Sequence, residues 1–297
     1  MMSQLIAFEN QVLGDNPLSE VILIEDIDFL ARKLIRLPSL RPLFIDKIVM
    51  LCQKYFHLSG FKERIIKGSI YKCPIVTYKL FKLGFIQFTD FSNYLMMDKC
   101  FMGCFYFRKE ILDFEQIIQK KKITEEFDPS NYTSDFEIDQ YINFGFKPST
   151  IEYCLKYDDI SEFREILSNP VILHVEEAKW SPFEWSRKPK ILDLLSFSGF
   201  FGSIQCFKHL LVSGWRISHY VSQTVICCGQ TELFHMCKFD VQDFSIHCCL
   251  AAEYCRLSIL EFLIESYGCI DANDADVSIR QMRILYCILD QERDISA

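Results

Sequence analysis

The sequence predicts an all-α protein in which a helical N-terminal region is followed by a solenoid of short helix pairs. The strongest sign is a pattern of two apolar helices around a tight turn, which covers Ser198–Gly214. The pattern returns in weaker form around Gly229 and again over Ala251–Leu263. Helices too short to bury their apolar faces alone are typical of a stacked repeat array. The chain also has only 11 glycines and 9 prolines in 297 residues, which favours helices joined by compact turns.

The first two helices are predicted from apolar residues at helical spacing. Residues 22–37 form the first, which ends at Pro38 because proline cannot continue a helix. Pro42 suits the first turn of the second helix. The buried stripe of this second helix is expected to consist of Leu43, Ile45, Ile48, Val49, Cys52 and Phe56.

Four further helices are predicted in the N-terminal half, at residues 62–71, 74–83, 90–107 and 109–121. Gly84 is expected to end the helix before it. The polar segment 124–134 contains a proline and is the expected boundary. We therefore predict a helical N-terminal domain at 1–134 and a repeat domain at 135–297. Whether the N-terminal helices are eroded repeats stays open.

The repeat domain is expected to begin with two helices at 150–157 and 160–167, separated by a turn at Asp158-Asp159. Residues 169–188 contain several prolines, so we predict a loop insertion laid against the stack. A last helix at 276–289 is expected to cap the array.

The turn of each pair measures the repeat length. The turn positions are Asp158, Gly202, Gly229 and Cys255, at steps of 44, 27 and 26 residues. The first step is long because it contains the insertion.

The segment 191–215 resembles an ankyrin repeat. Ser198-Gly199 occupy the small pair of the first helix, Gly202 the turn, and Gly214 the end of the second helix. Small residues let neighbouring helices approach closely, and glycine tolerates positive φ. Asp193 falls at the helix cap, where the family prefers Thr. The other copies keep fewer of these positions, namely Gly229, Ala251 and Ala252.

The C-terminal half further resembles the divergent ankyrin-repeat proteins of parabasalid protists, which pair a helical N-terminal domain of unknown function with ankyrin repeats. The resemblance rests on Ser181–Trp185, Lys188–Leu192 and Phe200–Gln205, and covers about residues 153–267. It implies an ankyrin-like α-solenoid with an intracellular, non-enzymatic, protein-binding role. The Thr-Pro-Leu-His signature of the family is missing, and the period is shorter than the usual ~33 residues.

Composition narrows the function classes. A net charge of −8 argues against nucleic-acid binding, which needs a basic surface. No apolar run reaches the ~18 residues of a membrane span, and the N-terminus does not read as a secretory leader. The 14 cysteines then indicate reduced thiols in the cytoplasm, where cysteine packs as a small hydrophobe.

The sequence offers little catalytic or cofactor chemistry. A zinc hypothesis could be built on Cys227, Cys228, Cys237, His247, Cys248, Cys249 and Cys255. Their spacing does not match the paired cysteines of structural zinc sites, and the repeat assigns them to the core. We therefore expect no catalytic residue, no cofactor and no metal.

The favoured hypothesis is a scaffold or adaptor that binds a protein through the repeat surface. Aromatic and arginine side chains often anchor such interfaces, so Trp215 and Arg216 are the first candidates, followed by Trp180 and Trp185. Trp180 and Trp185 could instead pin the insertion to the stack. The alternatives are a self-associating structural element, favoured by the 27 phenylalanines, and a Cys/His metal protein.

Overall fold

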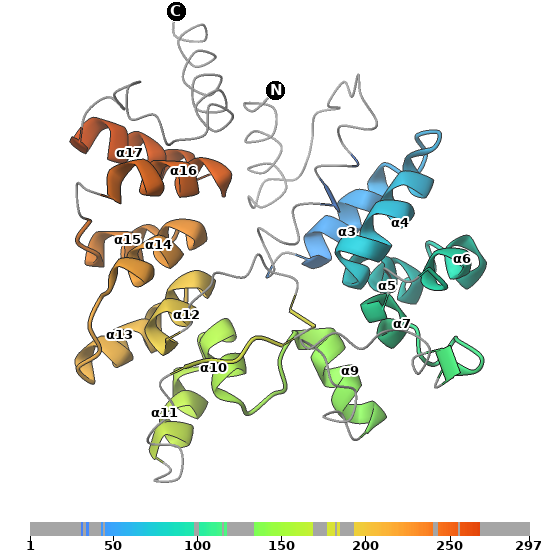
Figure 1. The fold of residues 1–297 in the computed structure, drawn as a ribbon, viewed down its shortest axis with the longest axis horizontal. Helices are drawn as coiled ribbons and strands as arrows, with labels where there is room; N and C mark the ends of the chain where they lie inside the picture. Colours follow the sequence, from blue (N-terminus) through green and yellow to red (C-terminus); the bar gives the residue numbers. More distant parts are fainter. Residues whose placement is uncertain are drawn as a thin grey trace, which may run out of the picture. The chain divides into compact units, whose positions relative to one another are not determined.

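The computed structural model describes residues 31, 34–35, 43, 45–97, 101–114, 116–117, 134–168, 177–181, 183–184, 193–239, 243–254 and 256–267. Over these residues the protein is helical and contains no strand (Figure 1). One isolated antiparallel bridge joins Glu177 to Asp193. The predicted all-α class is confirmed. The helices predicted at 22–37 and 276–289 lie largely or wholly outside the described residues.

The chain divides into two compact units. The N-terminal unit contains the described residues up to Phe146, together with Ser181, Phe183 and Glu184. The repeat unit contains the described residues of 147–180 and those from Asp193 onward. The division therefore falls after Phe146, whereas the sequence pattern placed the boundary at 134.

The N-terminal unit is built from short helices around a common core. Its elements are α3 (Ile45–Lys54), α4 (Phe61–Lys72), α5 (Pro74–Lys82), η2 (Phe88–Asp90), α6 (Ser92–Leu95), α7 (Phe101–Tyr106) and α9 (Asp135–Phe144). Helix α5 contacts α3, α4 and α7, so it lies at the centre of the unit. The predicted helices at 62–71 and 74–83 are confirmed, and Gly84 follows the second with φ +77°.

The predicted stripe of the helix after Pro42 is confirmed in its middle and wrong at its start. Ile48, Val49 and Cys52 are buried. Leu43 is 46% exposed, because the helix begins only at Ile45.

The predicted helix at 90–107 is wrong, because aromatic contacts fold this segment back on itself. In a straight helix, residues 91 and 107 would stand about 24 Å apart. The rings of Phe91 and Phe107 instead lie 4.4 Å apart, and both contact Phe81. Phe91 and Phe107 are fully buried. Burial of two large rings in one place thus outweighs the helical spacing of the sequence.

The helix predicted at 109–121 is also wrong over its first part. Residues 109–113 form turns, and Asp113 adopts the left-handed region with φ +58°. Such a residue cannot continue a right-handed helix.

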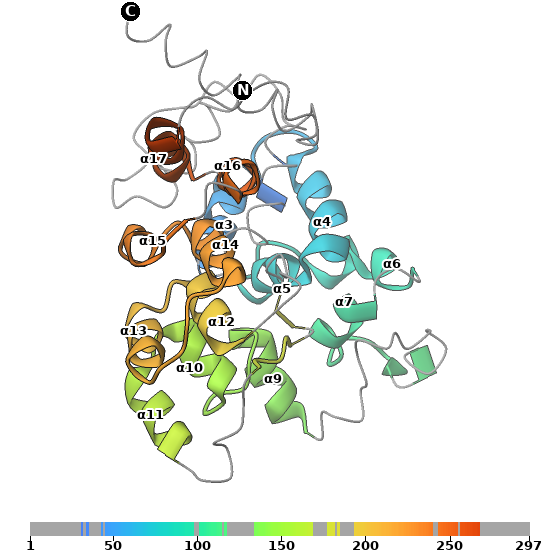
Figure 2. The ribbon, with the colours of Figure 1, turned by 60° about the vertical axis from the view of Figure 1, so that its left-hand side comes forward.

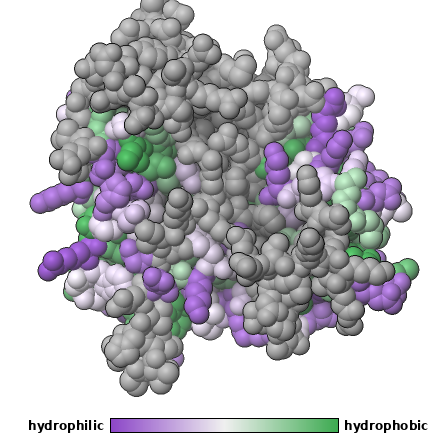
Figure 3. Space-filling model, in the orientation of Figure 1, coloured by the Kyte–Doolittle hydropathy of each residue, from purple (hydrophilic) through white to green (hydrophobic). Residues whose placement is uncertain are grey.

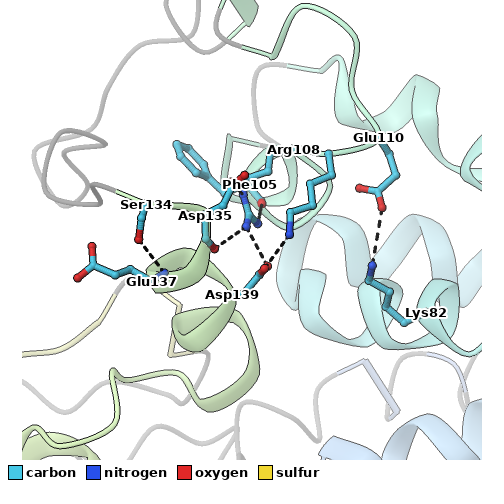
Figure 4. Close-up of polar contacts among 9 residues, drawn as sticks. Lys82, Phe105, Arg108, Glu110, Ser134, Asp135, Glu137 and Asp139 are labelled. Carbon is cyan, nitrogen blue, oxygen red and sulfur yellow. Dashed lines mark hydrogen bonds and ion pairs between the residues drawn. The ribbon is translucent and has the colours of Figure 1, made fainter.

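A buried arginine ties α9 to the segment that follows α7 (Figure 4). The side chain of Arg108 is only 5% exposed. Its Nε donates to Asp135 Oδ1 at 2.8 Å, and its Nη2 donates to Asp139 Oδ1 at 2.8 Å. Its Nη1 donates to the Phe105 carbonyl at 3.3 Å. Lys109 adds a bond to Asp139 Oδ2 at 2.7 Å. The guanidinium is therefore satisfied on several sides, as a buried charge requires.

The N-terminal unit also includes a short piece of the insertion. Phe183 is 2% exposed and its ring lies 5.9 Å from Tyr106 and 5.7 Å from Tyr141. The hydroxyl of Tyr106 donates to the Phe183 carbonyl at 3.4 Å. A residue from the middle of the predicted repeat domain therefore completes the aromatic core of the N-terminal unit.

The described residues of the repeat unit form four consecutive helix pairs, which appear as successive layers in Figures 1 and 2. The layers are α10 (Ile151–Tyr157) with α11 (Ile160–Ser168), α12 (Leu194–Phe201) with α13 (Ile204–Val212), α14 (His219–Cys228) with α15 (Thr231–Met236), and α16 (Phe244–Glu253) with α17 (Leu257–Tyr267). The predicted helices at 150–157 and 160–167 are confirmed. The predicted cap at Asp193 is also confirmed, since its carboxylate accepts the Ser196 amide at 2.7 Å.

Asp139 gives the N-terminal unit a testable pH dependence. Desolvation acts to raise the pKa of Asp139, but hydrogen bonds and positive charge from Lys109 and Arg108 outweigh it, so the pKa is lowered. A lowered carboxyl pKa stabilises the fold above the unfolded value of about 4, and this contribution is lost as pH falls through the folded value. We expect Asp139→Asn to lower the free energy of unfolding at pH 7 by about 1 kcal/mol. The urea-unfolding curve of the variant should change less than wild type between about pH 4 and pH 2.

The control is Asp46→Asn in the same unit. Asp46 pairs with Lys79, but its side chain is 81% exposed, so this change should cost under about 0.5 kcal/mol. Equal losses in both variants would contradict the assigned role of the Arg108 network.

Candidate functional site

The layers of the repeat unit are joined through their first helices. Helix α12 contacts α10 and α14, and α14 in turn contacts α16. Every residue of α12 is buried. A helix buried on all sides is expected in the middle of a core shared between neighbouring layers.

Small residues allow α12 and α14 to approach closely. Ser198 is fully buried. A Cβ added to Gly199 would lie 3.0 Å from Val225 Cγ2 and 3.1 Å from Thr224 Oγ1, which is tighter than ordinary contact. Ala251, at the equivalent place in α16, is also fully buried. The small side chains therefore set the spacing of these layers.

Each described turn between the two helices of a layer has the same backbone geometry. Asp158, Gly202 and Gly229 end α10, α12 and α14 in the left-handed region, with φ of 58°, 77° and 78°. The amide of each donates to the carbonyl four residues earlier. Cys255 lies outside the described residues, but the Arg256 amide donates to the Ala251 carbonyl at 2.7 Å. The Ser203 amide makes the equivalent bond to Ser198 at 3.0 Å. We call these positions the corners.

The first corner also caps a helix in the next layer. The two carboxylate oxygens of Asp158 accept the amides of Gln205 at 3.1 Å and Cys206 at 2.9 Å. These amides belong to the first turn of α13 and have no partner inside the helix. A negative charge at this end of a helix is also electrostatically favourable. Asp158 therefore joins the first and second layers.

Residues just after a corner reach back to the layer before. The Ser203 hydroxyl donates to the Leu155 carbonyl near the end of α10. In the same way, Arg256 donates to the Cys227 carbonyl in α14, through Nε at 2.9 Å and Nη2 at 2.8 Å. The last carbonyls of a helix lack intrahelical partners, so these bonds satisfy groups that would otherwise be buried at a cost. The corners therefore fix the register between layers.

The predicted partner-binding residues differ in their surroundings. Trp215 is half-buried just after Gly214, and its amide donates to the Leu210 carbonyl at 3.1 Å. Arg216 is exposed. The half-buried Trp180 packs on α12, with its ring 5.1 Å from Phe197 and 5.8 Å from Phe201. Trp185 lies outside the described residues. Trp180 thus has the contacts expected of a residue that anchors the insertion.

Two exposed apolar residues lie on the first helices of the two layers that follow Trp215. Tyr220 on α14 and Ile246 on α16 are each 44% exposed. They are 26 residues apart and so occupy equivalent positions in successive layers. Neither residue was predicted from the sequence, although the repeat step could have located both. We call Trp215, Arg216, Tyr220 and Ile246 the connector surface, because they lie in or next to the connectors between layers.

Of the cysteines in the zinc hypothesis, Cys227, Cys237 and Cys248 are buried, whereas Cys228 and Cys249 are partly exposed. Cys255 lies outside the described residues. Burial raises the pKa of Cys237 to about 11 and that of Cys248 to about 12, so both thiols stay protonated near neutral pH. Over the described residues, the cluster of possible metal ligands with donor atoms within 4.8 Å of one another consists of His219, Asp243 and His247, and it contains no cysteine.

Comparison with known proteins found no similar protein. No protein-family model matches the chain, and neither does any curated protein or solved structure. Within the described parts of the chain, no helix has both the length and the hydropathy needed to cross a bilayer.

The corner glycines should be more sensitive to substitution than a glycine with similar φ that faces open space. A Cβ on Gly202 would lie 2.6 Å from Cys228 Sγ in the next layer, whereas one on Gly214, with φ +96°, would meet nothing within 4 Å. Both alanine variants pay backbone strain of about 1 kcal/mol. We expect Gly202→Ala to lose about 1–3 kcal/mol more, because it also overpacks the contact between layers.

Urea unfolding of Gly202→Ala and Gly214→Ala, followed by circular dichroism, tests this difference. Equal destabilisation would mean that the corner does not set the distance between layers.

Proposed function

We propose that the chain is a non-enzymatic scaffold or adaptor that binds a protein partner through the surface of an ankyrin-like repeat stack. The observation that carries the proposal is the set of equivalent left-handed corners in consecutive helix pairs. Stacks of this kind present an extended surface whose side chains repeat from layer to layer.

The ankyrin-like character is supported by local geometry. Gly199 of the small pair faces α14, and Gly202 follows as a left-handed turn. Two features depart from the family. The described corners Gly202 and Gly229 are 27 residues apart, below the ~33 usual for ankyrin, and the connectors are correspondingly short. With short connectors, the first helices themselves carry more of the binding surface.

The connector surface is the best candidate for the contact with a partner. It combines a tryptophan, an arginine and a tyrosine, the residue types that dominate the energetics of protein interfaces. Tyr220 and Ile246 expose nearly half of their area while lying on helices whose other faces are buried. Rigid helices present such side chains at little entropic cost. Figure 3 shows hydrophobic patches between projecting hydrophilic side chains on the described surface in that view.

Pull-down from a native lysate tests the proposal with a matched pair of variants. The double variant Trp215→Ala/Arg216→Ala removes two of the four side chains of the connector surface. Val212→Ala serves as control, because Val212 is 89% exposed on the second helix α13 and is not part of the connector surface. We expect a partner to bind wild type and the control equally, and the double variant at least about tenfold more weakly.

Circular dichroism of all three proteins verifies that each is folded. Failure of wild type to retain any partner above background would refute the scaffold proposal. If only Val212→Ala loses the partner, the binding surface lies on the second helices instead. Light scattering at micromolar concentration shows whether the partner is a second copy of the chain.

A further inference from the structure

A cluster of two histidines and one aspartate links the third and fourth layers of the repeat unit. His219 is the first residue of α14, Asp243 directly precedes α16, and His247 lies on the first turns of α16. Asp243 and His247 are four residues apart, a spacing that places both on one face of a helix. His219 Nδ1 lies 2.6 Å from Asp243 Oδ2. From these residues we propose a binding site for a divalent transition-metal ion, and we expect this ion to be Zn²⁺.

The distances fit a single ion. The three donor atoms lie within 4.8 Å of one another. Zinc binds histidine nitrogen and carboxylate oxygen at about 2.0–2.2 Å, so two ligands of a tetrahedral ion stand about 3.4 Å apart. Side-chain rotations that move the donor atoms by roughly 1 Å therefore bring all three into range. Two imidazoles and one carboxylate are a ligand set that zinc uses where a fourth position stays open.

The surroundings orient the ligands. Gln223 Nε2 lies 2.6 Å from His219 Nε2, one turn along α14. When His219 coordinates through Nδ1, its ring proton sits on Nε2, and the Gln223 carboxamide can accept it after rotation. This is the outer hydrogen bond that typically holds a metal-bound imidazole. On the other side, Phe239 packs its ring 5.3 Å from the His247 ring. The cluster thus has a polar side chain, Gln223, next to His219 and an aromatic ring, Phe239, next to His247.

Exposure differs across the cluster. His247 is 1% exposed, whereas the side chains of His219 and Asp243 are 39% and 26% exposed. The ion would enter from the His219 side, and water would fill the remaining coordination position.

The electrostatics favour moderate affinity. The carboxylate of Asp243 attracts a cation, but the cluster lies at the N-terminal ends of α14 and α16, each equivalent to about half a positive charge. Structural sites with four protein ligands bind zinc strongly enough to drive the folding of a small domain. With three ligands and two opposing helix ends, we expect a dissociation constant of about 1 µM. Bound zinc would clamp α14 to α16.

Zinc titration of the full-length, chelator-stripped protein tests the site. We expect one equivalent to bind at about micromolar affinity by competition with a chromogenic indicator, and the melting temperature to rise by about 3–6 °C at tenfold excess over the dissociation constant. His219→Ala and Asp243→Asn should each weaken binding at least about tenfold and abolish the rise. Both replaced side chains are partly exposed, so these variants should fold, as circular dichroism without metal verifies.

His235→Ala is the control, because His235 is exposed on α15 and lies outside the cluster. It should bind zinc like wild type. Cobalt substitution separates this site from binding by free cysteines, since nitrogen and oxygen ligands give no intense thiolate charge-transfer band. The proposal fails if wild type binds no zinc at this affinity. It also fails if His219→Ala and Asp243→Asn bind as tightly as His235→Ala, or if the cobalt complex shows the thiolate band.

Discussion

The repeat unit depends on a left-handed residue at the end of three of its first helices, α10, α12 and α14. This conformation reverses the chain within two residues, so the second helix can fold back beside the first. It also leaves the last carbonyls of the first helix pointing outward, where Ser203 and Arg256 of later layers reach them. Intralayer geometry and interlayer hydrogen bonding therefore come from one backbone feature. A residue that avoids positive φ would disturb both at once.

The corners could be predicted because their cause is local. Gly202 and Gly229 follow apolar helices at a regular step, and glycine is the residue that best tolerates the required φ. The same holds for α5, bounded by Pro74 and Gly84. The segment 90–107 could not be predicted, because contacts among distant aromatic rings break a helix that the local pattern favours. Hydrogen bonds between layers depend on how the layers are stacked rather than on local sequence. An example is the bond from the Cys206 amide to Asp158, which lies 48 residues earlier.

The candidate binding residues also divide into those that the local sequence predicts and those that depend on packing. Trp215 and Arg216 can be predicted as binding residues from their residue types alone. Tyr220 and Ile246 become candidates only when their exposure and the alignment of their layers are known. The His219–Asp243–His247 cluster also needs two layers, since its members come from different helices. The metal hypothesis based on the sequence instead rested mainly on the cysteines. Burial of Cys237 and Cys248 removes the water that a thiolate would need, and this burial depends on packing.

The insertion affects the order in which the two units fold during translation. Phe183 completes the core of the N-terminal unit, yet α10 and α11 of the repeat unit precede it in the chain. During translation, the N-terminal unit cannot close its aromatic core until the ribosome has synthesised residue 184. When Phe183 leaves the exit tunnel, α10 and α11 of the other unit have left it already, because they precede Phe183 in the chain. The two units must therefore mature in an interleaved order, and a truncation after residue 146 would leave the Tyr106 and Tyr141 rings open to water.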